Sequence, residues 1–359
     1  MLIREAKEEN MQFDLPAKIV TPLLEWYGKN ARVLPWRENP DPYRVWVSEI
    51  MLQQTRVEAV KPYFERFIAA LPDLEHLAAA PEPLLMKLWE GLGYYSRVRN
   101  LQKAARMILT EFGGIFPSER EALLRLPGIG AYTAGAIASI SFGRPEPAVD
   151  GNVVRVLVRL TGCRAPGGSI ELRSAMAEAL RGIYPAGASG EFTQALMELG
   201  ATVCLPNGVP KCASCPLAGF CVAREGGFAE ALPVRERKAA RRVEFRTVLL
   251  LRNNGRFALA RRPERGVLAG MWEFPALPGA LDPAAVRERL SAWELEPGPV
   301  KPGPEARHIF THLEWRMNSF FVDCGRADPD FRWVTPEELE REIALPSAFR
   351  KFARALPRS

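Results

Sequence analysis

Four cysteines fall within eighteen residues, in the stretch CLPNGVPKCASCPLAGFC, with the spacing C-x7-C-x2-C-x5-C. They are Cys204, Cys212, Cys215 and Cys221. Four thiolates this close in sequence can hold one metal centre, either zinc or an iron–sulfur cluster. Structural zinc more often uses two C-x2-C pairs and only one is present, so the spacing favours a cluster by about two to one. The isolated Cys163 and Cys324 are expected to be inert core thiols.

Two carboxylates occupy positions suited to acid–base chemistry. Glu49 shares one face of an expected helix with apolar residues and with Arg56. It is either paired structurally, with Arg56 as one candidate partner, or partly desolvated with a raised pKa, which would make it a proton donor near neutral pH. Asp150 opens another expected helix, where it is either a simple N-cap or a carboxylate kept ionised to face a developing cation. Local pattern alone favours the structural alternative at both positions.

The stretch LPGIGAYTAGA, residues 126–136, places a Gly-x-Gly turn directly before a helical pattern. The backbone N–H groups around Gly128 and Gly130 can approach a phosphate of a nucleotide or of a DNA backbone. A dinucleotide-binding motif needs a preceding strand and a third glycine, and neither is present. Helix, glycine turn and helix, followed by Asp150 at the head of another helix, is the layout of a helix-hairpin-helix DNA-binding motif.

The elements that must position these residues are helical from residue 17 to about residue 225. Apolar residues recur at helical spacing throughout 45–71, where no proline occurs within the pattern until Pro62. Further helical stretches cover residues 83–92, 99–112, 118–126, 151–160 and 169–183. Short turns rich in glycine and proline join them, as expected for packed helices.

Beyond the cysteines the pattern changes. The basic stretch 233–242 is expected to be a linker. Its positive charges are at least as well explained by exposure to solvent as by direct contact with phosphates. Residues 243–262 follow as strand, Asn-Asn-Gly turn and strand, and residues 315–324 form another expected strand. The segment 335–338, Thr-Pro-Glu-Glu, has the spacing of a capping box. The last third is therefore expected to be a separate α+β domain.

The totals are consistent with a multidomain protein, and the positive net charge fits a polyanionic partner and a basic protein without such a partner about equally well. The chain has 359 residues, a formal net charge of +6 and only three histidines, which disfavours a histidine-rich metal site. No run of eighteen apolar residues occurs, and the N-terminus is charged from its fourth residue. We therefore expect no signal peptide and no membrane partner, and a cytoplasmic, nucleoid-associated protein.

Several stretches together resemble the MutY family of adenine DNA glycosylases. They are LPWRENPDPYRVWVSEIMLQQTRVEAVKPYFERF, WEGLGYYSRVRNL, LPGIGAYTAGA, AVDGNVVRV and LMELGATVC with the cysteines that follow it. The resemblance covers nearly the whole chain. It implies an all-α helix-hairpin-helix glycosylase region at 1–225, a linker at 226–242 and an α+β Nudix-like lesion-recognition domain at 243–359. Within the first region, a six-helix-barrel module spans about 34–142, and a cluster module is built from 1–33 and 143–225.

The resemblance implies an enzyme that removes adenine mispaired with 8-oxoguanine or guanine in double-stranded DNA, as a monomer carrying a [4Fe–4S] cluster. Glu49 would protonate N7 of the flipped adenine. Asp150 would stabilise the oxocarbenium-like sugar and form a transient covalent adduct, in line with two-carboxylate glycoside hydrolysis. Tyr132 and Asn152 would position these groups. Family members often also bind a monovalent cation at the hairpin, beside Gly128 and Gly130.

The same resemblance assigns three further groups of residues. The adenine pocket would be formed by Arg32, Trp36, Arg37, Leu52, Val57 and Gln194. Gln54 and Tyr94 would enter the base stack, since base removal requires extrusion from the duplex. The lesion would be read by His308, Phe310, Thr311 and His312, with the Thr311 hydroxyl accepting from the N7–H that distinguishes 8-oxoguanine from guanine.

The sequence departs from the family pattern at two places. The first cysteine gap is seven residues where six is usual, and Thr311 replaces the usual serine, which keeps the hydroxyl and adds a methyl group.

The segment after Gly279 lacks the carboxylates with which a Nudix hydrolase holds Mg²⁺, so the C-terminal domain is expected to bind and not to hydrolyse.

Four other functions compete with this one. A Nudix nucleotide hydrolase with a DNA-binding appendage is opposed by the missing carboxylates after Gly279. A bifunctional lyase needs a lysine amine where Tyr132 stands. A thymine-mismatch glycosylase shares the tyrosine but would lack the C-terminal domain. A catalytically silent DNA-damage sensor would not need Glu49 and Asp150, so the presence of both carboxylates argues against it.

Overall fold

The structure, a computed structural model, describes residues 13–234 and 240–357. The chain divides into two units, Met1–Ala79 with Asn100–Arg237, and Ala80–Arg99 with Lys238–Ser359. The expected linker 226–242 lies partly outside the described residues, as does the start of the expected cluster module at residues 1–12. The domain limits 1–225 and 243–359 therefore stay a prediction, and each unit is described by itself below.

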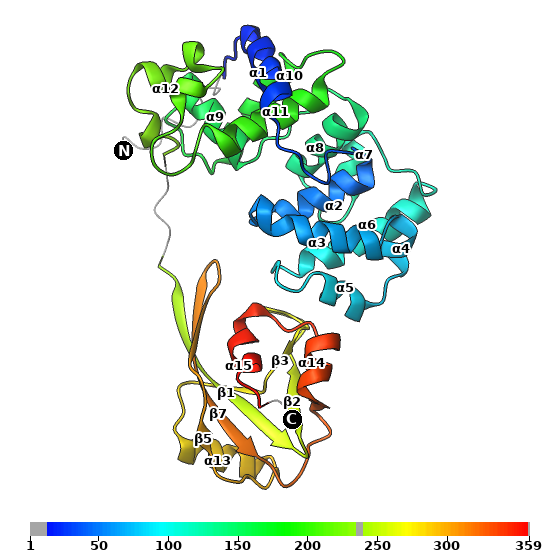
Figure 1. Ribbon diagram of the computed structural model, residues 1–359, viewed down its shortest axis with the longest axis vertical. Coiled ribbons are helices and arrows are strands. Elements are labelled where there is room, and N and C mark those ends of the chain that lie inside the picture. Colours follow the sequence, from blue (N-terminus) through cyan, green and yellow to red (C-terminus); the bar gives the residue numbers. More distant parts are fainter. Residues whose placement is uncertain (1–12, 235–239, 358–359) are drawn as a thin grey trace, which may run out of the picture. The chain divides into compact units, whose positions relative to one another are not determined.

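The first unit consists of helices joined by short turns (Figure 1). Its α-helices are α1 (Val20–Asn30), α2 (Pro42–Leu52), α3 (Val57–Ala70), α4 (Leu74–Ala79), α7 (Arg120–Arg125), α8 (Ala131–Phe142), α9 (Gly151–Thr161), α10 (Ile170–Arg181), α11 (Ser189–Thr202) and α12 (Val222–Glu225). Helix α6 (Ser96–Glu111) begins in the second unit and continues into the first. Short 3-10 turns lie at Ala17–Ile19, Cys212–Ser214, Ala218–Phe220 and Ala229–Ala231.

The helical spacing over 45–71 conceals a break. Helix α2 ends at Leu52, and α3 begins at Val57. Between them Gln54 has a φ of 59°, a left-handed conformation that a residue with a side chain rarely adopts. Apolar periodicity continues across the break because both helices bury a face, so the periodicity alone could not reveal the turn.

The glycine turn before α8 has the geometry that the sequence predicts for a hairpin. Gly128 has a φ of 82°, and an added Cβ would lie 2.8 Å from Cβ of Asn100. Two separate reasons, the backbone conformation and the close approach, therefore favour glycine there. Gly130 is the N-cap of α8 in an extended conformation.

Helix α8 is buried along most of its length and packs against α2, α7 and α11. Gly135 lies so close to the following chain that an added Cβ would be 2.1 Å from the carbonyl oxygen of Pro147. This approach brings the segment that leads into α9 directly against α8. Three sequence-distant elements, α2, α8 and the start of α9, consequently meet at one place.

Helices α9 and α11 complete the surroundings of that place. Asp150 caps α9 by accepting a hydrogen bond from the Val153 N–H at 2.7 Å. Gly200 in α11 lies against Asn152, where an added Cβ would be 2.6 Å from the asparagine Cβ. The glycine thus allows the two helices to approach closely just beside Asp150.

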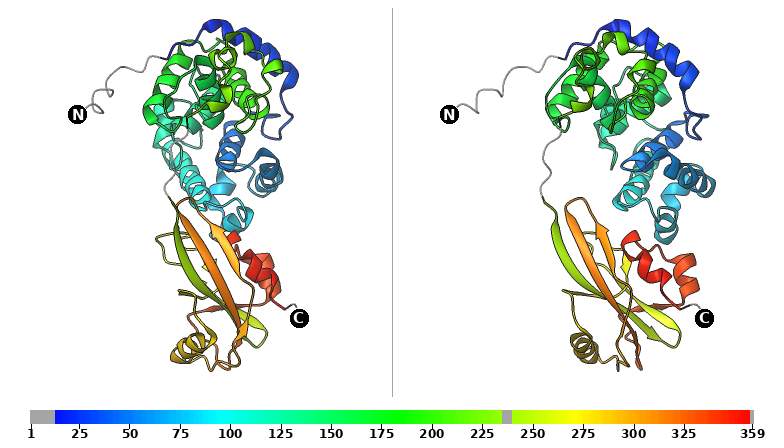
Figure 2. Two further views of the ribbon diagram at one scale, coloured as in Figure 1. Left: turned by 90° about the vertical axis from the view of Figure 1, so that its left-hand side faces the viewer. Right: turned by 60° about the vertical axis from the view of Figure 1, so that its left-hand side comes forward.

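The second unit is built on a sheet that the described residues show as eight-stranded (Figure 2). Its strands are β1 (Arg242–Asn253), β2 (Arg256–Arg261), β3 (Trp272–Glu273), β4 (Ala276–Pro278), β5 (Lys301–Pro302), β6 (Ala306–Ile309), β7 (Leu313–Asp323) and β8 (Arg332–Val334). Its helices are α5 (Glu82–Leu88), α13 (Pro283–Ala292), α14 (Pro336–Glu342) and α15 (Arg350–Arg354), with a 3-10 turn at Ser347–Phe349. The order β3-β2-β1-β7-β5 pairs β1 in parallel with β7.

The middle of strand β1, residues 247–251, is buried on both faces. Val248 and Leu250 belong to the apolar core under α14 and α15, whereas Leu249 and Leu251 belong to the core under α13. A continuous apolar run is the pattern of a strand covered on both sides. Helices therefore lie on opposite faces of the sheet (Figure 1).

Two local expectations for this unit are confirmed. The Asn-Asn-Gly turn joins antiparallel strands β1 and β2, and both Asn254 and Gly255 have positive φ, as a tight hairpin turn requires. Thr335 and Glu338 form a complete capping box at the start of α14. Among the described residues, no helix is both long enough and apolar enough to cross a membrane.

Candidate active site

A cavity of about 510 Å³ opens in the first unit where α2, α8, α9 and α11 meet. Its wall includes the four expected catalytic residues, all six expected pocket residues and one expected wedge: Glu49, Tyr132, Asp150, Asn152, Arg32, Trp36, Arg37, Leu52, Val57, Gln194 and Gln54. Residues more than 160 positions apart in sequence thus line one space. Gly128 and Gly130 are not in this wall; they form the hairpin turn before α8.

Glu49 is buried in the middle of α2, with 5% of its surface exposed. It accepts a hydrogen bond from the Tyr132 hydroxyl of α8. The pKa of Glu49 is raised to about 7: burial and, to a smaller extent, the nearby Asp150 raise it, and the Tyr132 hydrogen bond and the charge of Arg37 oppose the rise. The expected increase is confirmed. The structure shows no ion pair between Glu49 and Arg56 among the described residues, and the partner of Glu49 is Tyr132 instead.

Asp150 is both a helix cap and a wall residue. Its Oδ1 accepts from the Val153 N–H, and its Oδ2 accepts from the Asn152 side-chain amide at 2.8 Å. These hydrogen bonds act in the expected direction, because they stabilise the ionised form. Burial nevertheless outweighs them and raises the pKa of Asp150 above its ordinary value. The carboxylate is therefore held in place by the cap while it is largely removed from water.

A chain of hydrogen bonds leads from Asp150 to the cysteine loop through Arg155. Arg155 Nη2 donates to Asn152 Oδ1 at 2.7 Å and to the Gly200 carbonyl at 2.7 Å. Its Nε donates to the Cys204 carbonyl at 2.7 Å. The amide of Asn152, with its oxygen engaged in this way, can only turn its NH₂ group toward Asp150. The sequence analysis missed Arg155; its position one helical turn after Asn152 is the signal that could have found it.

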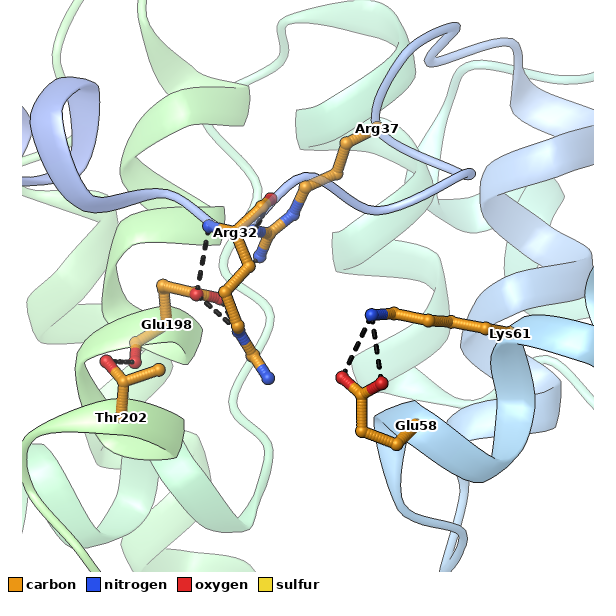
Figure 3. Close-up of polar contacts among 6 residues, drawn as sticks. All are labelled: Arg32, Arg37, Glu58, Lys61, Glu198 and Thr202. Carbon is orange, nitrogen blue, oxygen red and sulfur yellow. Dashed lines mark hydrogen bonds and ion pairs between the residues drawn. The ribbon is translucent and has the colours of Figure 1, made fainter.

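Two pocket arginines are held by a carboxylate that the sequence analysis did not select. The side chain of Glu198, in α11, is completely buried. It forms ion pairs with both Arg32 and Arg37 (Figure 3). Glu198 lies four residues after Gln194, so helical spacing places both on one face. That spacing, together with its charge within an apolar helix, is the signal that could have identified it.

The four clustered cysteines line one apolar cavity of about 30 Å³ and form no disulfide. Burial, together with the three other cysteines nearby, raises the pKa of Cys215 to about 11. Arg159 contacts two of them: its Nη1 donates to Cys204 Sγ at 3.3 Å, and its carbonyl accepts from Cys221 at 3.3 Å. No group of three or more described His, Cys, Asp or Glu residues is arranged to hold a single metal ion. The structure thus brings the four cysteines that the sequence predicts as metal ligands around one small cavity.

The remaining expected residues lie in the second unit. Tyr94, His308, Phe310, Thr311 and His312 all line a cavity of about 510 Å³ there. The Tyr94 and Thr311 hydroxyl groups are hydrogen-bonded at 2.8 Å, and Tyr94 has a φ of 47°. The structure thus brings the second expected wedge together with the expected lesion-reading residues.

Comparison with known proteins agrees with this arrangement. Residues 47–181 match the model of the HhH-GPD superfamily of base excision DNA repair proteins, and residues 247–355 match the NUDIX domain. The mouse adenine DNA glycosylase is 36% identical over an alignment that covers 92% of this chain and 76% of the mouse protein. The human adenine DNA glycosylase is 35% identical, over an alignment that covers 92% of this chain and 72% of the human protein.

The chain belongs to the adenine DNA glycosylase family. A thermostable thymine-DNA glycosylase has the same helical fold, with a TM-score of 0.52 and 29% identity over 58% of this chain and 97% of that one. The structure of endonuclease III in a non-covalent DNA complex matches with a TM-score of 0.50 and 25% sequence identity. The match covers 59% of this chain and 98% of endonuclease III. This adenine DNA glycosylase family member is therefore a base-excision enzyme that acts on DNA, with a helix-hairpin-helix region and a Nudix-like domain.

Replacing Glu49 by Gln is expected to stabilise the protein above neutral pH. The pKa of Glu49 rises from 4.5 to about 7 on folding. As pH rises through that interval the unfolded chain releases a proton that the folded protein retains, so wild-type stability falls. The whole shift corresponds to on the order of 3 kcal/mol. Urea unfolding at about pH 5 and about pH 8 should show similar stabilities at the lower pH and a more stable E49Q variant at the higher one.

The matched control for that experiment is Glu58→Gln, which changes a glutamate with 74% of its side chain exposed. It should leave the pH dependence as it is in the wild type. Parallel pH dependences for wild type and E49Q would show that burial does not hold the Glu49 proton.

Proposed function

We propose that the protein excises adenine mispaired with 8-oxoguanine or guanine from duplex DNA and leaves an abasic site in an intact strand. It does so as a monomer on the DNA of the cytoplasmic nucleoid. The observation that carries the proposal is the pairing of a buried carboxyl group whose pKa is about 7, Glu49, with a capped carboxylate, Asp150, in the wall of one cavity. Such a pair of acids in different environments is suited to breaking a glycosidic bond.

The chemistry follows from the two environments. Once the adenine is extruded into the cavity, Glu49 transfers its proton to N7, so the electrons of the C1′–N9 bond can leave with the base. Asp150 stabilises the cation that develops at C1′ and forms a transient ester with it. Water then displaces the aspartate, donating OH to C1′ and returning a proton to the site. Tyr132 and Asn152 hold the two carboxyl groups by the hydrogen bonds described above.

The residue at the start of α8 supports a glycosylase without lyase activity. A lyase forms a Schiff base between a lysine amine and C1′ of the sugar. Here Tyr132 stands at that position, and its hydroxyl donates to Glu49. Burial raises the Tyr132 pKa well above its ordinary value, so the phenol stays neutral and cannot replace an amine nucleophile.

The pocket and the wedges prepare the base for this chemistry. The amide of Gln194 can both donate to and accept from the edge of adenine. Gln54 and Tyr94 share a left-handed backbone conformation, which is costly for such residues and is typical of functional turns. We assign to them the filling of the gap and the wedging of the stack. Gly128 and Gly130, helped by a monovalent cation, offer N–H groups to the DNA backbone.

The second unit supplies lesion recognition. Its sheet carries β6 and β7, joined at the turn that contains Phe310, Thr311 and His312, with His308 on β6. A hydroxyl at Thr311 can accept from the N7–H of 8-oxoguanine, which guanine lacks. The domain binds without hydrolysing nucleotides, because the sequence after Gly279 lacks the carboxylates that would hold Mg²⁺.

We assign a [4Fe–4S] cluster to Cys204, Cys212, Cys215 and Cys221. When bound, the cluster joins four points of an otherwise irregular loop into one rigid unit. Arg155 and Arg159 anchor the start of that loop through the Cys204 carbonyl and sulfur atoms. The loop of seven residues between the first two cysteines accommodates its extra residue with a Gly208 of positive φ.

The decisive assay uses labelled duplexes with adenine opposite 8-oxoguanine, guanine, cytosine or thymine, each developed with and without alkali. We expect strand breaks only after alkali, from the 8-oxoguanine and guanine duplexes. E49Q should slow excision by about 10²- to 10⁴-fold, the usual contribution of a general acid, whereas E58Q should match the wild type. Breaks without alkali would indicate a lyase, and no release opposite 8-oxoguanine would refute the proposal.

Thr311→Val keeps the shape of the side chain and removes its hydroxyl. We expect the preference for 8-oxoguanine over guanine to fall by about 10-fold, the effect of one lost hydrogen bond, with excision opposite guanine unchanged. Single-turnover rates on the two duplexes give this ratio. Thr110→Val, at an exposed site on α6, is the control, and an unaltered preference in T311V would assign lesion reading to another residue.

Cys212→Ser is expected to abolish iron binding and the broad visible absorption of the cluster. Cys163→Ser should leave both unchanged, because Cys163 is not among the residues that line the cysteine cavity. Metal analysis with a visible spectrum makes the measurement. Purified wild-type protein containing zinc and no iron would overturn the cluster assignment.

A further inference from the structure

The turn that precedes α6, residues 91–94, has left-handed backbone conformations at three of its four residues. The φ angle is 105° at Gly91, 70° at Gly93 and 47° at Tyr94. Glycine adopts such values readily, whereas they are costly for a residue with a bulky side chain. Tyr94 is 49% exposed, so burial alone does not hold it in this conformation. Polar contacts with the turn must therefore supply much of what keeps it there.

Arg97, in the first turn of α6, reaches back over this turn. Its Nη2 donates to the Leu92 carbonyl at 2.8 Å and to the Gly93 carbonyl at 3.2 Å. Its Cζ lies 5.7 Å from the centroid of the Tyr94 ring and 5.3 Å from the centroid of the Trp89 ring. A guanidinium ion at such a distance is attracted by the face of an aromatic ring. One side chain thus binds both the backbone of the turn and the ring that the turn presents.

Two further contacts complete the support of the turn. Trp89 is fully buried, and its indole Nε1 donates to the same Gly93 carbonyl at 3.1 Å. At the far end of the ring, the Tyr94 hydroxyl is hydrogen-bonded to the Thr311 hydroxyl at 2.8 Å. Arg97 therefore acts near the backbone of Tyr94, and Thr311 acts at the tip of its side chain.

The position of Arg97 is unfavourable for a cation in two respects. The first turn of a helix is the positive end of its dipole, and α6 has no acidic residue in its first turn. Burial also disfavours the charged form and lowers the pKa of Arg97 to about 10, which still leaves the group charged at neutral pH. The two carbonyl groups and the two ring faces offset these costs. Helix formation does not require an arginine here, but the preceding turn uses one.

We propose that Arg97 is a positioning residue for the wedge: by binding the Leu92 and Gly93 carbonyls and the face of the Tyr94 ring, it holds that ring ready to enter the base stack. The inference rests on the proposed function, which assigns the wedging of the stack to Tyr94. Arg97 acts through Tyr94 and needs no contact with DNA. Without it, the turn and the ring would have to be ordered when DNA binds, which costs conformational entropy.

Arg97→Met tests the proposal, because it keeps the length of the side chain and removes the guanidinium group. The probe is a duplex with adenine opposite 8-oxoguanine and 2-aminopurine beside the 8-oxoguanine, since 2-aminopurine fluoresces more strongly when it is unstacked. We expect R97M to reduce the rise in fluorescence on binding. Single-turnover excision should fall by about 10-fold, the effect of losing one charge-assisted hydrogen bond. Arg97→Lys, which keeps a cation near the ring, should retain part of both signals.

The matched control is Arg66→Met on α3. The Arg66 guanidinium lies 4.6 Å from the centroid of the Tyr63 ring, so this variant removes the same kind of contact elsewhere in the chain. It should match the wild type in both measurements.

A double-mutant cycle with Tyr94→Ala separates positioning from general support of the fold. Y94A should lower fluorescence and excision, and adding R97M to it should lower them no further, because Arg97 acts through the ring that Y94A removes. A purely structural role predicts instead that R97M slows excision as much in Y94A as in the wild type. If R97M does not fold, the same cycle is run with R97K.

Unchanged fluorescence and excision in R97M, or an equal further loss in the Y94A background, would overturn the proposal. A Y94A variant that behaves as the wild type would refute the wedge assignment and this inference with it. A failure of the proposed function looks different, because the wild-type enzyme itself would then release no adenine opposite 8-oxoguanine or guanine.

Discussion

The removal of Glu49 from water is the constraint on which the rest of the site depends. A carboxyl group in bulk water is ionised at neutral pH and has no proton to give, whereas burial moves its pKa to about 7. Burial requires that α2 be covered, and α8 covers it closely enough for the Tyr132 hydroxyl to reach the carboxylate. That hydrogen bond opposes the pKa shift without cancelling it. Burial therefore keeps the pKa of Glu49 high, and the single hydrogen bond from Tyr132 orients the carboxyl group.

In Asp150, too, burial raises the pKa while hydrogen bonds oppose the rise, but the donors are different. Asp150 receives hydrogen bonds from a helix N-terminus and from Asn152, which hold its orientation, while burial raises its pKa. Its orientation depends on Asn152, which depends on Arg155, which in turn binds the carbonyl of Cys204. The close approach of Gly200 to Asn152 keeps these parts together. A cysteine loop and a catalytic carboxylate are consequently parts of one hydrogen-bonded structure in the first unit.

Local signals in the sequence were sufficient for several turns and helix starts, whereas most of the cavity wall was assigned through the family resemblance. The N-cap at Asp150, the turn at Gly128 and the capping box at Thr335 each follow from side-chain chemistry within a few residues. The break at Gln54 was not predictable from periodicity, because the apolar pattern of α2 continues into α3. Glu198 was missed for another reason. Its role is to bind two arginines that lie 161 and 166 residues away in the chain, and the local sequence around a carboxylate in an apolar helix does not identify such partners.

The residues that the sequence could not place are those whose partners are distant in the chain, and this follows from the physics of buried charge. An isolated carboxylate inside a protein is too costly to keep, so each buried one must find compensation. Glu198 finds it in two arginines and stays ionised, because their hydrogen bonds and charges lower its pKa against the effect of burial. Glu49 receives only a hydrogen bond from a phenol and the charge of a more distant arginine, and its pKa rises to about 7. Two glutamates in the wall of one cavity therefore have pKa values shifted in opposite directions, and the number of cationic donors that each one contacts decides the direction.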